Sequence, residues 1–358
     1  MAERRELKCL IAAGGTAGHV LPSLAVAEAL VARGARVTFA GSPDRAEARL
    51  VPDAGYELDT FRVSGLPRQP GLAQARAVLH GLAAPAACDR ILARRGPNAV
   101  LGAGGYVGGP MVVAAARRRI PTALTEADAH LGLANRLAVP FAKRVFLSFP
   151  IAGRNPPKYL LTGRPIPARS RPLPREEARR RLDLPADGPV LLVAGGSQGA
   201  RALNDLAVET FGASGPAVVH LSGESEYRRL QERVSRDDYK LLPFSEDYGT
   251  VLGAVDLALS RAGGGVWELA AAGVPAVLVP YPFATADHQT KNARYFQAAG
   301  GAILIPESEL GSVPETVRSL VDDPARLQEM SAAMRRVAKP DAAETIAEEL
   351  MALAAARG

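Results

Sequence analysis

Four glycine clusters in this chain have residue types that suit the binding of a phosphate-bearing ligand. They are Gly14-Gly15-Thr16-Ala17-Gly18-His19, Gly102-Ala103-Gly104-Gly105-Tyr106-Val107-Gly108-Gly109-Pro110, Gly195-Gly196-Ser197-Gln198-Gly199 and Arg261-Ala262-Gly263-Gly264-Gly265. Glycine lets the backbone turn sharply and approach a ligand closely, and the free amides at the start of a helix attract anions. A tight strand-to-helix turn explains one such cluster equally well. Four of them, two in each half of the chain, indicate ligand sites.

Several side chains near the clusters could carry chemistry. His19 is a candidate general base, because an imidazole titrates near neutral pH; the alternative is a histidine that caps its helix or binds phosphate. Asp128 is the competing base. Glu268 lies in the first turn after the fourth cluster, where a carboxylate can accept both hydroxyls of a ribose or simply complement the start of a helix.

Three rival chemistries follow from the same clusters. A nicotinamide dehydrogenase would need Gly-x-Gly-x-x-Gly after the first strand and an acidic residue where the second strand ends, near Ala40. The first cluster does not fit this pattern, and the acidic residue is missing at that strand end. A P-loop is excluded, because no Gly-Lys-Ser/Thr follows any cluster. A serine hydrolase fits better, since Ser197 stands in Gly-x-Ser-x-Gly with Asp256 and His288 after it. Against the hydrolase, the matching cluster in the first half carries Thr16, which favours shared binding geometry over a nucleophile.

The elements that must position these residues read as two α/β halves. Apolar strand-like runs alternate with alanine-rich helical stretches, for example the strand 7–13 followed by the helix 22–33 that Gly34 closes. Nine prolines between 150 and 189 mark a connection, after which the alternation restarts. Leu10–Gly18 and Leu191–Gly199 align at a constant offset of 181 residues. We therefore expect two doubly wound, Rossmann-like domains facing across a cleft, with ligands at the carboxyl ends of their strands.

Composition narrows the class of protein. The 358 residues are 47% apolar, enough for two domains that each bury a core. No run of 18 apolar residues is present, and the two cysteines, Cys9 and Cys88, lack metal-type spacing and are expected to be buried thiols in a reducing compartment. The net charge of +6 suits an anionic substrate or membrane surface. One tryptophan and few other aromatic residues argue against nucleic acid.

The motifs, taken in order, resemble one enzyme family. Gly-Gly-Thr-x-Gly-His, Gly-x-Gly-Gly-Tyr-Val-x-Gly-Pro, Gly-Gly-Ser-Gln-Gly-Ala-Arg-x-Leu-Asn and Asp-His-Gln-x-x-Asn-Ala are all present, and the chain resembles the peptidoglycan N-acetylglucosaminyltransferases of the MurG type over essentially its whole length. The resemblance implies an inverting glycosyltransferase of the GT-B fold. Such an enzyme moves N-acetylglucosamine from its UDP conjugate to the muramyl 4-hydroxyl of lipid I, an undecaprenyl-diphosphate-linked muramyl-pentapeptide, without a cofactor. The absence of an Asp-x-Asp pair fits a metal-independent reaction.

The resemblance also assigns domains and residues. It implies an acceptor domain over 1–163, joined by a C-terminal helix at about 341–358, and a UDP-N-acetylglucosamine-binding domain over 164–340. It places His19, Asp128 and Glu126 in catalysis. Donor contacts fall on Thr16, Ala17, Gly18, Asp128, Arg164, Ser197, Gln198, Gly199, Ser245, Gly264, Gly265, Glu268, His288 and Gln289, and acceptor contacts on Gly14, Gly15, Gly104, Gly105, Tyr106 and Asn135.

Two departures from the family pattern concern charged residues. Asp128 stands where the family has an asparagine that touches the donor sugar, and an ionised carboxylate accepts hydrogen bonds but cannot donate them. The family's Gly-Asn-Pro-Val-Arg reads Gly163-Arg164-Pro165-Ile166-Pro167 here, so Pro167 replaces an arginine and Arg164 or Arg169 is expected to compensate.

A lipid-linked acceptor requires contact with a membrane surface. The stretch 72–95 places Leu72, Ala75, Leu79, Leu82, Ala83 and Ala86 at helical spacing among arginines, and Arg117-Arg118-Arg119 ends a nearby helix. A basic helix with an apolar face can rest on anionic lipid, whereas the alternative is a core-facing stripe with solvated arginines. We expect peripheral attachment through the first half, at the cytoplasmic face of the cell membrane.

Overall fold

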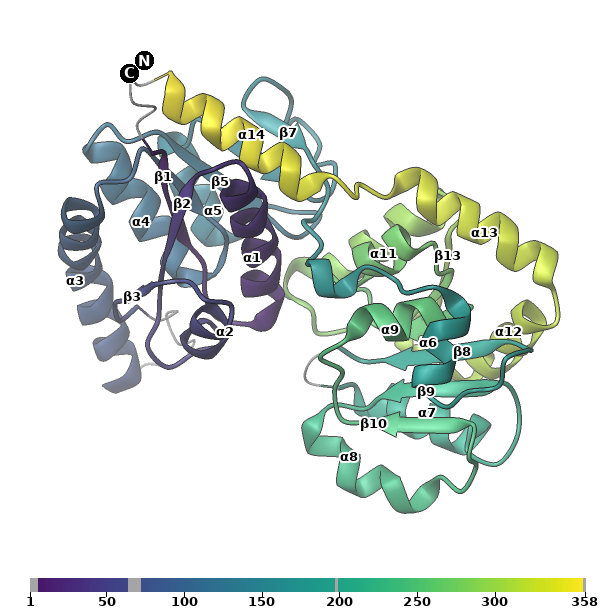
Figure 1. Cartoon of the computed structure of the whole chain (residues 1–358). Coiled ribbons are helices and arrows are strands. Elements are labelled where there is room, and N and C mark those ends of the chain that lie inside the picture. Colours follow the sequence, from purple (N-terminus) through teal and green to yellow (C-terminus); the bar gives the residue numbers. More distant parts are fainter. Residues whose placement is uncertain (1–5, 64–71, 197–198, 357–358) are drawn as a thin grey trace. The chain divides into compact units, whose positions relative to one another are not determined.

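The computed structural model describes residues 6–63, 72–196 and 199–356, with side chains 72–82 outside the description. The chain divides into two compact units. Unit 1 comprises residues 1–167 and 340–358, and unit 2 comprises 168–339. Each unit is built on one wholly parallel sheet (Figure 1).

Unit 1 contains a sheet of seven strands in the order β3-β2-β1-β4-β5-β6-β7. The strands are β1 (Lys8–Ala12), β2 (Arg36–Gly41), β3 (Leu58–Thr60), β4 (Ala99–Gly102), β5 (Thr122–Glu126), β6 (Arg144–Leu147) and β7 (Tyr159–Leu161). The main helices are α1 (Ala17–Ala32), α2 (Glu47–Asp53), α3 (Leu72–Arg95), α4 (Gly105–Arg117), α5 (Leu133–Ala138) and α14 (Ala342–Ala355), and a 3-10 turn, η1 (Val139–Phe141), follows α5. The direction in which successive strands are added to the sheet reverses between β1 and β4. Open α/β sheets bind ligands at such a switch point.

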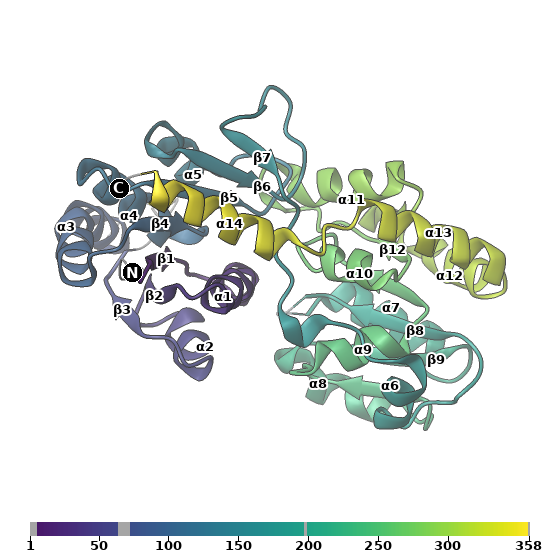
Figure 2. The ribbon, with the colours of Figure 1, turned by 45° about the horizontal axis from the view of Figure 1, so that its top comes forward.

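Helices cover both faces of this sheet, which explains why its strands are continuous apolar runs. Cys9 and Ile11 of β1 point into a core shared with α1 and α14, whereas Leu10 and Ala12 point into a core shared with α3 and α4. The C-terminal helix α14 lies against α1 (Figure 2), and Arg33 pairs with Glu348 across them at 2.8 Å.

Unit 2 repeats the plan with six strands in the order β10-β9-β8-β11-β12-β13. The strands are β8 (Val190–Ala194), β9 (Ala217–Leu221), β10 (Tyr239–Leu242), β11 (Leu257–Ser260), β12 (Ala276–Leu278) and β13 (Ala302–Leu304). Its helices are α6 (Arg175–Arg181), α7 (Arg201–Phe211), α8 (Glu224–Leu230), α9 (Tyr248–Ala254), α10 (Val266–Ala272), α11 (His288–Ala298), α12 (Val313–Val321) and α13 (Pro324–Val337), and the 3-10 turn η2 (Ala168–Ser170) opens the unit. Its switch point lies between β8 and β11.

The fold corrects one expected boundary. The helix expected to begin at Pro22 begins at Ala17 instead, so Pro22 lies inside it. Proline needs no amide donor in the first turn of a helix but removes one further in. The earlier start places His19 in the first turn of α1, close to the strand end, and leaves one helical carbonyl without its usual donor.

Candidate functional site

The four glycine clusters follow the four strands that flank the two switch points. They come after β1 and β4 in unit 1 and after β8 and β11 in unit 2. The carboxyl ends of parallel strands meet at one edge of a sheet, and this edge at the switch point is where open α/β sheets bind ligands. The glycine clusters that the sequence analysis singled out therefore lie at both switch points.

In unit 1 the first two glycine clusters touch each other around His19. Gly104 has a positive φ of 88°, and a side chain there would overlap the His19 ring. Gly105, with φ of 68°, approaches the carbonyl of Gly14 so closely that it has no room for a Cβ. His19 is half-buried, and its Nδ1 lies 3.3 Å from Thr16 Oγ1. Burial is the main cause that lowers the pKa of His19 below its usual value, so the ring is biased toward the neutral form that accepts a proton.

A carboxylate that the sequence did not reveal supports the first cluster from beneath. Glu47, at the start of α2, is completely buried and accepts hydrogen bonds from the amides of Gly15 at 2.9 Å and Ser42 at 2.8 Å. A side chain at Gly14 would overlap this carboxylate. Glu47 is the second acidic residue after β2, following Asp44, and it binds the backbone of the glycine cluster. An acid six residues beyond the end of β2 was the only available signal.

Arg164 reaches the first turn of α1 from the end of β7. It is 8% exposed, and its Nη2 donates a hydrogen bond to the carbonyl of Gly18. Arg164 acts electrostatically on the neighbouring His19 and lowers its pKa, whereas Asp128 and Glu47 raise it. Arg164 and Asp128, the two charged departures from the family pattern, thus act on the same imidazole with opposite sign.

Glu126, at the end of β5, organises the loop that carries Asp128. Its carboxylate accepts hydrogen bonds from Asn135 Nδ2 at 2.8 Å, the Gly132 amide at 2.9 Å and the Asp128 amide at 3.3 Å. Asn135 Nδ2 also donates to the carbonyl of Thr125 at 2.9 Å. Burial is the largest influence on Glu126 and raises its pKa, although these donors oppose the shift. Glu126 and Asn135 therefore bind each other and the neighbouring backbone. Tyr106, another predicted acceptor contact, is 60% exposed at the start of α4.

In unit 2 the fourth glycine cluster presents Glu268 beside a residue from the start of the unit. Glu268 lies in the first turn of α10, next to Gly264 and Gly265, and is half-buried. Ser170 in η2 is 3% exposed and donates from Oγ to Glu268 Oε1 at 2.5 Å. Glu268 also raises the pKa of Tyr248, although burial is the larger cause. No local sequence pattern points to Ser170, because its partner lies 98 residues away.

Beneath the third cluster lies a buried polar chain. Gly199, with φ of 75°, packs against the carbonyl of Ser222 without room for a Cβ. Asn204 of α7 donates to that carbonyl at 2.9 Å and contacts His220 Nε2 through Oδ1 at 3.0 Å, and His220 Nδ1 lies 2.8 Å from Tyr239 Oη. Because Asn204 Oδ1 can only accept, Nε2 must carry the proton. Burial lowers the pKa of His220 to about 4. Ser197 and Gln198 lie outside the described residues.

The segment after β12 carries two predicted donor ligands. His288 Nδ1 donates to the carbonyl of Thr285 at 2.9 Å, and Gln289 Oε1 accepts from the Tyr281 amide at 2.9 Å. Ala286 and Asp287 have φ of 54° and 53°, a left-handed conformation that costs non-glycine residues free energy and gathers at functional sites. The predicted Ser245 is half-buried between β10 and α9.

A serine hydrolase triad is not assembled. Asp256 immediately precedes β11, at the amino end of the sheet, and its carboxylate binds Arg175, Arg179 and the amide of Val190. His288 follows β12 at the opposite, carboxyl end and is oriented by Thr285. The order of residues along the sequence therefore suggested a triad that the sheet separates.

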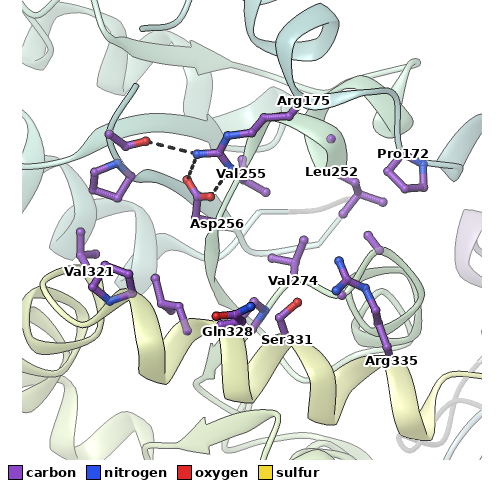
Figure 3. Close-up of a pocket in the computed structure, with 18 of the residues that line it drawn as sticks. Pro172, Arg175, Leu252, Val255, Asp256, Val274, Val321, Gln328, Ser331 and Arg335 are labelled. Carbon is purple, nitrogen blue, oxygen red and sulfur yellow. Dashed lines mark hydrogen bonds and ion pairs between the residues drawn. The ribbon is translucent and has the colours of Figure 1, made fainter. Parts of the chain in front are cut away.

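A cavity at the amino edge of the unit 2 sheet is separate from the site. Its volume is about 670 Å³, and it is walled by α13 and the segments that precede β8, β11 and β12. Figure 3 shows Arg175 directed to Asp256 on one side and Ser331 and Arg335 on the α13 side. The third and fourth glycine clusters follow β8 and β11 at the other edge of the sheet, so this cavity lies away from them.

In the part of the chain that the structure describes, no three histidine, cysteine, aspartate or glutamate side chains gather closely enough to hold a metal ion. None of the described helices combines the length and apolarity needed to cross a membrane.

Family models match both units. The N-terminal domain of glycosyltransferase family 28 matches residues 9–147, and the C-terminal domain of that family matches residues 190–346. Two relatives bear the name UDP-N-acetylglucosamine–N-acetylmuramyl-(pentapeptide) pyrophosphoryl-undecaprenol N-acetylglucosamine transferase. The protein of Methylococcus capsulatus is 43% identical and spans 95% of this chain and 97% of its own. The protein of Acidithiobacillus ferrooxidans is 42% identical, and the match spans 94% of this chain and 95% of that protein.

Solved structures share the architecture. The crystal structure of Acinetobacter baumannii MurG superposes with a TM-score of 0.76 at 28% identity, over 97% of this chain and 99% of that one. A UDP-GlcNAc 2-epimerase from Neisseria meningitidis superposes with a TM-score of 0.65 at 14% identity, over 97% and 100% of the two chains, which shows a common fold alone. The expected fold class, two Rossmann-like parallel-sheet domains of the GT-B type, is confirmed.

Proposed function

The chain belongs to the MurG-type N-acetylglucosaminyltransferases of glycosyltransferase family 28, and on that premise we propose that it transfers N-acetylglucosamine from UDP-N-acetylglucosamine to the muramyl 4-hydroxyl of lipid I, making lipid II. The observation that carries the proposal is the placement of His19 in the first turn of α1, where both glycine clusters of unit 1 meet.

In the proposed reaction the acceptor oxygen attacks the anomeric carbon of N-acetylglucosamine from the face opposite the diphosphate. The new C–O bond forms as the bond to the UDP oxygen breaks, so the configuration inverts. The hydroxyl proton passes to the imidazole of His19, whose lowered pKa favours the neutral base before attack. Asp128 is the alternative acceptor of this proton. UDP leaves with the bonding electrons as an anion.

Unit 2 would hold the leaving group. Glu268 would accept the ribose hydroxyls, and His288 and Gln289 would contact the sugar. The amides that precede α7, a helix of 11 residues, would stabilise the diphosphate. In unit 1, Thr16, Ala17 and Gly18 would lie near the transferred sugar, and Gly14, Gly15 and Gly104 near the diphosphate of the acceptor.

The direct test supplies UDP-N-acetylglucosamine with a lipid I analogue and measures UDP release and the disaccharide product. We expect both to depend on the acceptor and to fall at least about 100-fold in a His19→Ala variant, as for loss of a general base. If UDP is released with a different acceptor and not with the lipid I analogue, the enzyme uses another glycosyl acceptor. Conversion of the sugar nucleotide to its 2-epimer without acceptor would replace the transferase proposal with an epimerase.

We further propose that unit 1 attaches the protein to the cytoplasmic face of an anionic membrane. Leu133, Leu137 and Phe141, at spacings of four residues on α5 and η1, are 71%, 67% and 44% exposed. Arg117 and Arg119 are exposed at the end of α4, which packs against α5. The neighbouring Arg118 is engaged with Asp89.

Part of the expected lipid-facing stripe of α3 can also be placed. Ala83 and Ala86 are exposed, whereas Ala84, Cys88 and Leu92 pack into the core. The other predicted members, Leu72, Ala75, Leu79 and Leu82, lie outside the described side chains.

Vesicle flotation with anionic phospholipid tests the attachment. We expect binding to fall severalfold in Leu133→Ser/Leu137→Ser and in Arg117→Glu/Arg119→Glu, because apolar burial and charge attraction act together at a lipid surface. The matched control is Leu161→Ser, a 42% exposed leucine on β7. Unchanged flotation of both double variants would refute attachment through this surface.

A further inference from the structure

We propose that Arg164 and Glu47 are positioning residues that hold the first turn of α1 and the loop leading into it, and so orient the His19 imidazole. Arg164 binds the carbonyl of Gly18, the residue before His19, and Glu47 binds the amide of Gly15 in the preceding loop. The inference rests on the proposed function only where it assigns proton transfer to His19. The contacts themselves are independent of that assignment.

The carbonyl that Arg164 binds has lost its normal partner. In an α-helix the carbonyl of residue 18 accepts a hydrogen bond from the amide of residue 22. Residue 22 is Pro22, which has no amide hydrogen. A helical carbonyl that lacks its donor costs free energy unless water or a side chain replaces it. The guanidinium of Arg164 supplies the missing donor from a position 146 residues away, and its 8% exposure shows that it is built into the fold.

Glu47 acts on the loop that leads into this turn. Its Oε2 accepts from the Gly15 amide at 2.9 Å and its Oε1 from the Ser42 amide at 2.8 Å, so one carboxylate ties the glycine cluster to the segment after β2. The side chain is 0% exposed. Gly14 and Gly41 both pack against it without room for a Cβ. These contacts leave the loop before α1 little freedom to move.

The two residues also carry opposite charges toward His19. Burial lowers the pKa of His19 most, Arg164 lowers it further, and Asp128 and Glu47 raise it. Thr16 is the neutral polar group at the ring, 3.3 Å from Nδ1. Arg164 and Glu47 both bind the backbone near His19. Because one is a cation and the other an anion, their effects on the pKa of His19 oppose each other. A base needs both a fixed direction and a suitable pKa.

A rescue experiment separates positioning from contact with substrate. Arg164→Met keeps the apolar stem of the side chain and removes its donors. We expect kcat to fall about tenfold, with the KM for UDP-N-acetylglucosamine changing less than about twofold. Pro22→Ala restores an amide that can donate to Gly18, so Pro22→Ala/Arg164→Met should recover at least about fivefold of the lost kcat. A tenfold rise in KM with unchanged kcat, or no recovery, would overturn the role of Arg164.

Glu47 is tested by Glu47→Gln, which keeps the shape and one acceptor. We expect kcat to fall about threefold to tenfold, because only one of the two amides stays bound. The controls are Arg49→Met and Asp53→Asn, which remove an exposed pair on the same helix, 3.7 Å apart and 73% and 60% exposed. They should keep kcat within about twofold of the parent. A Glu47→Gln variant with parental kcat would refute its role.

NMR tests the same arrangement without any substrate. The His19 titration midpoint should move to higher pH in Arg164→Met and to lower pH in Glu47→Gln, while the controls should leave it in place. Hydrogen exchange of the Gly15 amide should accelerate in Glu47→Gln. Shifts of the same sign in both variants, or no shift, would overturn the proposal. If the parent protein lacks transferase activity, the proposed function fails, and these measurements still decide whether Arg164 and Glu47 hold the turn.

Discussion

Ser170 donates a hydrogen bond of 2.5 Å to the carboxylate of Glu268. Ser170 belongs to the first turn of unit 2, only three residues after its boundary at Pro167, and is buried. A short bond between a hydroxyl and a carboxylate is charge-assisted and fixes the orientation of the acceptor. Glu268 is the proposed ribose ligand, so its rotamer is set before the nucleotide arrives.

Removing this hydroxyl should weaken donor binding. We expect Ser170→Ala to raise the KM for UDP-N-acetylglucosamine about fivefold, equivalent to about 1 kcal/mol, because Glu268 would be free to rotate away from the ribose. The kcat should change less than about twofold. Ser235→Ala, an exposed serine of the same unit, is the matched control, and steady-state kinetics with varied donor is the measurement. Equal KM values in the two variants would contradict the positioning of Glu268 by Ser170.

Sequence reasoning predicted the parts of the candidate site that local pattern encodes. A glycine cluster between an apolar run and a helix is visible within about ten residues, so the loops around His19 and before Glu268 were predicted, together with the two-unit fold. Glu47, Ser170 and the partner of Arg164 were not, because their roles arise from contacts 32, 98 and 146 residues apart. The first turn of α1 was missed because Pro22 was read as the start of the helix rather than an interruption within it.

Arg179 should be a large contributor to the stability of unit 2. It is 1% exposed, and its guanidinium donates to Asp256 at 2.8 Å and to the carbonyls of Ala254, Pro185 and Ala186 at 3.1, 3.2 and 2.9 Å. Arg179→Met would leave the buried carbonyl of Ala254 without this donor and would remove one of the partners of Asp256, so it should lower the free energy of unfolding by about 1–3 kcal/mol.

Arg175 provides the comparison, since it binds the same carboxylate but its side chain is 49% exposed. Arg175→Met should lower the free energy of unfolding by less than about 1 kcal/mol. The single tryptophan, Trp267, is fully buried in unit 2, so its fluorescence during urea denaturation reports on this unit. Equal losses for the two variants would show that burial does not determine the contribution of each arginine.

Asn135 should stabilise the loop that presents Asp128. Asn135→Ala removes the donor to Glu126 and Thr125 and should cost about 1–3 kcal/mol locally, because a buried carboxylate loses a partner. We expect faster hydrogen exchange at the Gly132 amide and a severalfold fall in kcat. Asn155→Ala, in an exposed loop of unit 1, should change neither. Unaltered exchange at Gly132 in Asn135→Ala would indicate that Glu126 holds the loop without Asn135.

His220 should make unit 2 sensitive to acid. Burial lowers its pKa from 6.5 to about 4, so between these values the unfolded chain binds a proton that the folded chain does not. The free energy of unfolding therefore falls as the pH drops from 6.5 to 4, and the loss from this residue reaches about 3 kcal/mol below pH 4. Above pH 6.5 the imidazole is neutral in both states and contributes no pH dependence.

The titration can be isolated with His220→Gln, which keeps a donor and an acceptor but does not ionise. We expect this variant to be less stable than the parent at pH 7.5 by about 1–2 kcal/mol, because its contacts to Asn204 and Tyr239 are less well placed. The free energy of unfolding of the variant should then fall less steeply between pH 6.5 and 4, so that the variant and the parent become similar in stability at low pH. Urea denaturation followed by Trp267 fluorescence across this range measures both curves. Parallel curves would show that His220 is already protonated in the folded protein or stays neutral in the unfolded chain.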